Sequence, residues 1–196
     1  EVLLHGYEQW GVDLLQRVRG MFTFVIWDKN KQELFGARDH FGIKPFYYAK
    51  MNGTFMYASE IKSLLRHPDF VKELNAEALK PYMTFQYPAI GETFFKGVYK
   101  LPEGHYFTYR DGKMDIHRYY DEDFREGKQK LGELVNSIDQ TVCDSVKAHQ
   151  IADVEVGSFL SSGVDSSYVA AVARPQHTYS IGFGKGTYNE SQQAGE

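Results

Sequence analysis

Residues 154–167 read Val-Glu-Val-Gly-Ser-Phe-Leu-Ser-Ser-Gly-Val-Asp-Ser-Ser. The first half of this stretch is short, apolar and rich in β-branched residues, which is typical of a buried strand. A turn of small residues follows at 161–163, and Asp165 to Ser167 stand where a helix would begin, ahead of the helix-forming run 168–173. We therefore predict a strand, a tight turn and a helix N-terminus in direct succession.

A junction of this kind binds anions, because the free N–H groups of the first helical turn point at the ligand and the helix dipole favours negative charge. Hydroxyl groups can donate to phosphate oxygens, whereas the Asp165 carboxylate reaches a phosphate only through a cation such as Mg²⁺. An ordinary helix cap needs one Ser or Asp, but here six of the seven positions 161–167 are small or polar. The stretch has neither the Gly-Lys-Ser/Thr of a Walker A loop nor the spacing of a dinucleotide fingerprint.

Composition narrows the class of protein. The chain has 196 residues, enough for one large domain or two small ones, and its hydrophobic fraction of 42% allows a packed core. A net charge of -4 without a run of Lys or Arg argues against nucleic-acid binding, and no apolar run approaches the length of a membrane span. With Cys143 as its one cysteine the chain cannot form an internal disulfide, which predicts a reducing compartment, the cytoplasm.

Residues 1–120 alternate short helical and strand patterns. Helical spacing over 1–19 is interrupted near Gly11, with Gly20 as the expected end, and short helices are predicted after Ser59 and Asn75. We expect strands at 21–27, 33–38, 45–50 and 54–58, and hairpins within 93–120. The turns are predicted at Asn52-Gly53 and Asp111-Gly112, which favour type I′ geometry.

A second region follows a charged stretch at 121–130, which we interpret as a linker and a domain boundary. Beyond it, apolar residues at spacings of three and four predict an amphipathic helix: Leu131, Leu134, Ile138, Val142 and Val146. A further apolar strand is predicted at 177–183. Strand, helix and strand in this order indicate a βαβ unit and a parallel sheet.

Particular segments resemble known families. Residues 161–167 resemble the pyrophosphate loop of the ATP-pyrophosphatase superfamily. Upstream, residues 36–48, 58–62 and 98–105 resemble the later half of a class II glutamine amidotransferase domain. The two modules in this order resemble the glutamine-hydrolysing asparagine synthetases, and the resemblance covers essentially the whole chain.

The resemblance implies an α+β fold. We expect an αββα amidotransferase sandwich with its N-terminal part missing, followed by the start of an α/β nucleotide-binding domain built on a parallel sheet. The implied boundaries are 1–120 for the C-terminal part of the amidotransferase domain, 121–130 for the linker, and 131–196 for the N-terminal part of the synthetase domain. Both ends of the chain look cut, so we expect these residues alone to be inactive.

The activity implied for the parent enzyme is the ATP-dependent amidation of aspartate to asparagine through β-aspartyl-AMP, with ammonia released from glutamine. The implied cofactors are ATP and Mg²⁺, and the partners are the small molecules aspartate, glutamine and ATP, with no nucleic acid and no membrane. A homodimer is an open alternative. Two other interpretations also stay open: an amidotransferase or β-lactam-forming synthetase that acts on another carboxylate, and a non-catalytic fragment.

The resemblance assigns site residues only in the second region. It implies ATP and pyrophosphate binding, with phosphates on the N–H groups of Gly163 to Ser166, by Ser161, Ser162, Gly163, Val164, Asp165, Ser166 and Ser167. It places Phe159 and Ile181 beside the adenine, and Mg²⁺ on Asp165. Ser162 stands where the superfamily usually has Gly, a change that we expect to be tolerated. No catalytic residue is assigned, because the N-terminal cysteine nucleophile of the family does not occur in this chain.

Other candidate groups have simpler interpretations. Cys143 has no basic partner near it in sequence, so a structural thiol is preferred to a nucleophile. The seven histidines are scattered without a zinc-binding spacing. Arg38 and Asp39 could form a catalytic pair, but an ion pair at a strand end that fixes the following Gly42 turn is preferred.

Overall fold

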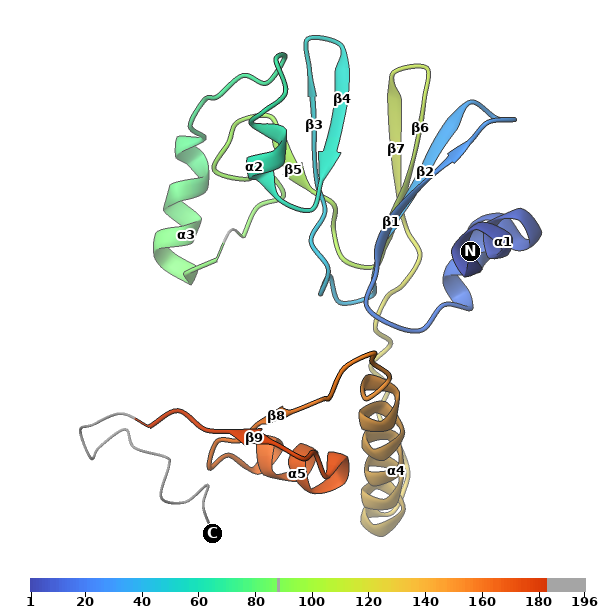
Figure 1. Cartoon of the computed structure of the whole chain (residues 1–196), viewed down its shortest axis with the longest axis vertical. Coiled ribbons are helices and arrows are strands. Elements are labelled where there is room, and N and C mark those ends of the chain that lie inside the picture. Colours follow the sequence, from blue (N-terminus) through green and yellow to red (C-terminus); the bar gives the residue numbers. More distant parts are fainter. Residues whose placement is uncertain (88, 183–196) are drawn as a thin grey trace. The chain divides into compact units, whose positions relative to one another are not determined.

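The computed structural model describes residues 1–87 and 89–182 (Figure 1). The chain divides into two units, Glu1–Phe124 and Arg125–Glu196. This division falls inside the charged stretch 121–130, and the assignment of the domains on either side of it stays a prediction.

Unit 1 contains two antiparallel sheets. The first has the strand order β1-β2-β6-β7 and the second has the order β4-β3-β5 (Figure 1). The strands are β1 (Thr23–Asp28), β2 (Glu33–Arg38), β3 (Tyr47–Met51), β4 (Thr54–Ala58), β5 (Val98–Lys100), β6 (His105–Arg110) and β7 (Lys113–Arg118). The strands predicted at 33–38 and 54–58 are confirmed to the residue.

Short helices flank these sheets in unit 1. They are α1 (Val2–Trp10), the 3-10 helix η1 (Gly11–Gln16), α2 (Ile61–Leu64), the 3-10 helix η2 (Ala76–Ala78) and α3 (Leu79–Phe85). The predicted interruption near Gly11 is confirmed, because Gly11 caps α1 with a φ of 57°. Two expected helix ends are wrong: η1 ends at Gln16 rather than near Gly20, and α2 is preceded by Glu60 rather than Ser59.

Three hydrophobic clusters stack the elements of unit 1 in layers. Tyr7, Leu14 and Leu15 of α1 and η1 pack on Phe35 and Ala37 of β2. Between the two sheets, Phe46, Leu101 and Phe107 form a second cluster with side chains from both sheets. On the other side, Leu64 of α2 packs on Ala49, Met56 and Val98. Helices and two antiparallel sheets in this arrangement agree with the predicted α+β amidotransferase fold.

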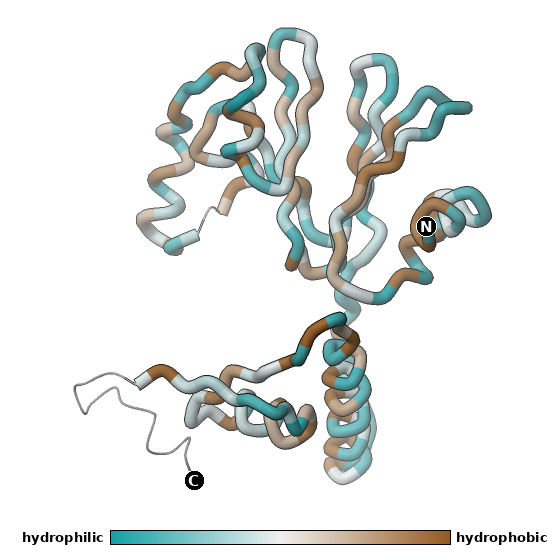
Figure 2. The backbone as a smooth tube through the Cα atoms, viewed as in Figure 1, coloured by the Kyte–Doolittle hydropathy of each residue, from teal (hydrophilic) through white to brown (hydrophobic). Residues whose placement is uncertain are grey.

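The hairpin turns follow from the local sequence. Asn52 and Gly53 have φ values of 51° and 81°, and Asp111 and Gly112 have values of 50° and 74°. Positive φ at both central residues is what a type I′ turn requires, so these predictions are confirmed. In Figure 2 the hairpin tips are hydrophilic, whereas hydrophobic residues concentrate along β1 and β2.

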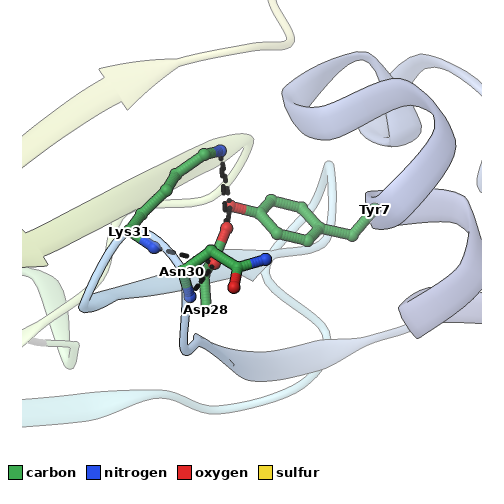
Figure 3. A network of polar contacts seen from close by, with 4 residues as sticks. All are labelled: Tyr7, Asp28, Asn30 and Lys31. Carbon is green, nitrogen blue, oxygen red and sulfur yellow. Dashed lines mark hydrogen bonds and ion pairs between the residues drawn. The ribbon is translucent and has the colours of Figure 1, made fainter.

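A polar network ties α1 to the β1–β2 turn (Figure 3). The Tyr7 hydroxyl donates to Asp28 Oδ2 at 3.2 Å and accepts from Lys31 Nζ at 3.1 Å. Asp28 Oδ1 also accepts the main-chain N–H groups of Asn30 and Lys31 at 2.9 and 3.0 Å. The bond from the Lys31 N–H is the largest of the effects that lower the pKa of Asp28, and burial is the main effect that raises the pKa of Tyr7.

Unit 2 contains α4 (Leu131–His149), β8 (Ser158–Phe159), α5 (Val164–Ala173) and β9 (Thr178–Tyr179). The predicted amphipathic helix is confirmed as α4, which alternates hydrophilic and hydrophobic residues in Figure 2. Strands β8 and β9 pair in parallel, with α5 between them in the chain, although each strand is shorter than expected. Phe183, the end of the second predicted strand, lies outside the described residues.

Candidate functional site

The small-residue stretch lies at the carboxyl end of β8 and leads into α5. Gly163 occupies the N-cap position with an extended backbone, and Asp165 stands in the first turn of the helix. The carboxyl ends of parallel strands, next to a helix N-terminus, are where α/β folds bind ligands. The predicted succession of strand, turn and helix is therefore present in the structure.

Two of the predicted hydroxyl groups are used inside the loop. Ser166 Oγ accepts the main-chain N–H of Ser161 at 3.2 Å and lies 2.8 Å from Ser161 Oγ. It also lies 3.0 Å from the carbonyl oxygens of Ser161 and Gly163, to which its proton can be donated. Ser166 thus brings the two sides of the turn together through its side chain.

The N–H groups of the loop divide into two sets. The Gly163 N–H donates to Ser161 Oγ at 3.3 Å, so it is engaged within the loop and not open as we expected. The Ser167 N–H donates to the Gly163 carbonyl at 3.1 Å and closes the first helical turn. The N–H groups of Val164, Asp165 and Ser166 make no hydrogen bond to any residue that the structure describes. These three are the donors that the helix start offers to a ligand.

The departure at Ser162 causes no backbone strain. Within residues 1–87 and 89–182, the non-glycine residues with positive φ do not include Ser162. Gly163 is also outside the positive region, with a φ of -73°. A Cβ at Gly163 would lie 3.3 Å from Ser161 Oγ, so the hydroxyl pair explains the small residue there. The backbone at Ser162 therefore does not require glycine, and its tolerance of a nearby phosphate stays a prediction.

Asp165 is exposed in the first turn of α5. Its carboxylate makes no hydrogen bond to any residue that the structure describes. The described residues hold no group of three or more His, Cys, Asp or Glu side chains that could bind a metal ion by themselves.

Phe159 and Ile181 lie at the carboxyl ends of the two parallel strands. Phe159 is the last residue of β8 and is 78% exposed, with its ring edge-on to Tyr179 at a centroid distance of 6.5 Å. Ile181 follows β9 and is 69% exposed. The Ser180 hydroxyl donates to the Leu160 carbonyl at 2.6 Å, which joins the two strand ends. Phe159 and Ile181, the two residues predicted beside the adenine, are thus exposed at the carboxyl edge of the sheet, where the loop begins.

Arg38 and Asp39 have a structural role in unit 1. Both are buried, at 2% and 1% exposure. The Arg38 guanidinium donates to the carbonyl oxygens of Lys44 and Leu101, each at 2.7 Å, and to that of Gly42 at 2.5 Å. The Asp39 carboxylate accepts the N–H groups of three loop residues at 2.9 to 3.3 Å: Phe41, Ile43 and Lys44.

The two side chains fix the Gly42 turn as predicted, but by a different means. Among the described residues, the ion pairs within 4.0 Å do not include one between Arg38 and Asp39. Each side chain bonds to the main chain instead of to the other. With no exposed reactive atom, this pair is not a candidate for catalysis.

A contact between helices escaped prediction. The Tyr168 hydroxyl on α5 donates to Asp139 Oδ1 on α4, and this bond raises the pKa of Tyr168 to about 12. The half-buried thiol of Cys143 belongs to the same helix α4. No sequence pattern links positions that are 29 residues apart on two different helices.

Two family models match this chain. The family model described as a glutamine amidotransferase domain matches residues 1–120. The chain belongs to this family. A second model, described as asparagine synthase, matches residues 137–196, which include the loop at 161–167. The two families occur in the order that the sequence predicts.

Individual relatives agree with the family models. The chain is 40% identical over its whole length to glutamine-hydrolyzing asparagine synthetase 1 of Bacillus subtilis, and 33% identical over 93% of its length to asparagine synthetase 3 of the same organism. An amidase named chry2, from Gibberella zeae, is 33% identical over 88% of the chain. The chain spans about a third of the length of the two synthetases, 32% and 31%.

In the described ranges 1–87 and 89–182, none of the helices has the length and hydropathy of a membrane-spanning segment.

Proposed function

We propose that the intact protein carrying this chain is a glutamine-hydrolysing asparagine synthetase. It forms β-aspartyl-AMP and pyrophosphate from aspartate and ATP, and ammonia from glutamine then displaces AMP to give asparagine. The observation that carries the proposal is the pairing of the two family matches, 1–120 and 137–196, in one chain. The relatives named asparagine synthetase support it over the full length of this sequence.

The loop 161–167 is the ATP site of this proposal. The β- and γ-phosphates would rest on the main-chain N–H groups of Val164, Asp165 and Ser166, at the positive end of the α5 dipole. The Ser162 and Ser167 hydroxyls make no bond within the loop, so they are the side-chain donors available to phosphate oxygens. Donors fixed in this way stabilise the charge that builds on the leaving pyrophosphate.

Asp165 suits a Mg²⁺ ion that arrives with ATP. Proteins commonly hold Mg²⁺ through one or two carboxylates together with substrate phosphates, rather than in a cage of protein ligands. A single exposed carboxylate beside the phosphate-binding N–H groups fits that mode. Mg²⁺ would supply charge neutralisation on the phosphates, while Phe159 and Ile181 would contact the adenine.

The remaining assignments belong to the same proposal. Residues 1–120 would be amidotransferase sequence, 121–130 a linker, and 131–196 the beginning of the nucleotide-binding synthetase domain. The substrates would be aspartate, glutamine and ATP, and the single cysteine supports a location in the reducing cytoplasm. A homodimer is an alternative to the monomer.

A second candidate function keeps the chemistry and changes the acceptor. One relative, 33% identical over most of the chain, carries the name amidase and not asparagine synthetase, so similarity at this level does not by itself fix the acceptor. In this alternative, ammonia from glutamine amidates a carboxylate other than that of aspartate.

A product assay distinguishes the two candidates. The intact protein is incubated with glutamine, ATP, Mg²⁺ and either aspartate or another carboxylic acid, and amino acids and nucleotides are quantified. The proposal predicts asparagine, glutamate, AMP and pyrophosphate in equal amounts with aspartate. Formation of ADP and phosphate, or amide formation only with another acid, would refute it.

A further inference from the structure

Helix α5, which begins within the loop 161–167, is not anchored by buried side chains. None of its residues is buried in unit 2. Its residues Val169 and Ala173 face Val142 and Val146 of α4 across a partly open cavity of about 380 Å³. Apolar side chains around an unfilled space hold a helix loosely, because few of their atoms are in van der Waals contact.

Among the described residues, two polar contacts link α5 to α4 and its C-cap residue, one at the middle of α5 and one at its C-terminal end. The Tyr168 hydroxyl donates to the Asp139 carboxylate, and the Gln150 side-chain amide donates to the Ala173 carbonyl at 2.7 Å. A hydrogen bond to a carboxylate is directional and stronger than one between neutral groups. The Asp139–Tyr168 contact is therefore the stronger of the two attachments.

The position of Tyr168 connects this contact to the loop. Tyr168 directly follows Ser167, whose N–H bonds to the Gly163 carbonyl and closes the first turn. The next residues towards the N-terminus are Ser166, which braces the loop, and Asp165. A movement of Tyr168 away from α4 would turn this whole segment.

We propose that Asp139 and Tyr168 are positioning residues for the loop 161–167. Their contact sets the direction in which the first turn of α5 presents its N–H groups, and through it the affinity for the phosphates of ATP. This inference rests on the proposed function, because it concerns the same site. Neither side chain needs to touch the ligand.

The test compares Tyr168→Phe and Asp139→Ala with Gln150→Ala, which removes the far contact. In the intact protein, KM for ATP and kcat are measured by aspartate-dependent ATP–pyrophosphate exchange. Loss of a charge-assisted bond that aligns the site should raise KM for ATP roughly tenfold in either near variant. The N–H groups contact the phosphates already in the ground state, so kcat should fall by a smaller factor than KM rises.

Two comparisons make the test specific. The double variant Tyr168→Phe with Asp139→Ala should equal either single variant, since both remove one contact. Gln150→Ala should leave KM for ATP unchanged. A contact that only supports folding would lower kcat through the active fraction and leave KM unaltered, and that result would overturn the inference.

Hydrogen exchange without ATP gives an independent readout. The Ser167 amide, which closes the first turn, should exchange several-fold faster in Tyr168→Phe and Asp139→Ala than in the unmodified protein. Unchanged exchange would overturn the inference. An unmodified protein without ATP–pyrophosphate exchange would instead refute the proposed function, and amide exchange would still decide whether Asp139 and Tyr168 hold the loop.

Discussion

The hydroxyl oxygens of Ser161 and Ser166 lie 2.8 Å apart across the turn that joins β8 to α5. Ser166 Oγ also accepts the Ser161 N–H and lies within bonding distance of two carbonyl oxygens. The two serines therefore shape the loop from inside. Ser162 and Ser167 are the serines of the loop whose side chains make no bond to the described residues.

Ser166→Ala should loosen the turn. The Ser161 N–H then loses its acceptor, and its exchange with solvent should rise several-fold in the unliganded protein. Amide exchange measured by NMR checks this, with Ser167→Ala as the matched control because the Ser167 hydroxyl makes no bond to the described residues. Equal exchange in the two variants would show that Ser166 does not brace the loop.

Arg38→Met should destabilise unit 1 by roughly 3 kcal/mol or more. The substitution keeps most of the side-chain volume but leaves the buried carbonyl groups of Lys44, Gly42 and Leu101 without their donor. Urea unfolding gives the free energy of unfolding. Arg110→Met, at an exposed arginine, should change it by less than about 0.5 kcal/mol. A similar small change in Arg38→Met would contradict the structural role.

Gly36→Ala should cost roughly 2 kcal/mol by overpacking the space between the sheets. A Cβ on Gly36 would lie 2.3 Å from the Phe107 ring and 3.1 Å from the Phe24 carbonyl oxygen. Gly91→Ala is the control, because a Cβ there has no neighbour within 4 Å. Thermal unfolding of the two variants side by side should show a clear loss only for Gly36→Ala, and matching midpoints would count against this packing.

The lowered pKa of Asp28 makes part of the free energy of unfolding depend on pH in the acid range. Its pKa in the folded protein lies below the ordinary value of 3.8, chiefly because the Lys31 N–H bonds to the charged carboxylate. The folded state therefore binds this proton less readily than the unfolded chain, so the contribution is complete above about pH 4 and is lost as pH falls through the folded pKa. Asp28→Asn should flatten the decline in unfolding free energy below pH 4.

The exposed residue Asp13 supplies the comparison for that measurement. Asp13→Asn should keep the acid dependence of the unmodified protein. If Asp28→Asn and Asp13→Asn give the same slope below pH 4, the network around Tyr7 does not act through the charge of Asp28.

Local patterns could be predicted from the sequence because their physical causes are local. The turn at Asn52 and Gly53 needs only two residues that accept positive φ, and the interruption at Gly11 has the same origin. The partners of Arg38 could not be predicted, because Leu101 is 63 residues away and becomes a neighbour only when the sheets pack. The contact of Tyr168 with Asp139 escaped for the same reason.

The loop shows what cannot be predicted from composition alone. Its composition predicts a phosphate site, but composition does not tell which hydroxyl groups turn inward. Ser161 and Ser166 do so because the turn brings their side chains within 2.8 Å of each other. The division of the loop serines into those that bond within the loop and those that do not comes only from the folded geometry.

In the proposed function, residues 161–167 bind the phosphates of ATP, and Asp165 is the carboxylate for Mg²⁺. Aspartate-dependent ATP–pyrophosphate exchange by the intact protein tests it most directly. We expect exchange in the unmodified protein and its loss in Asp165→Ala, with folding unchanged because Asp165 makes no bond to the described residues. Exchange at the unmodified rate in Asp165→Ala would contradict the claim.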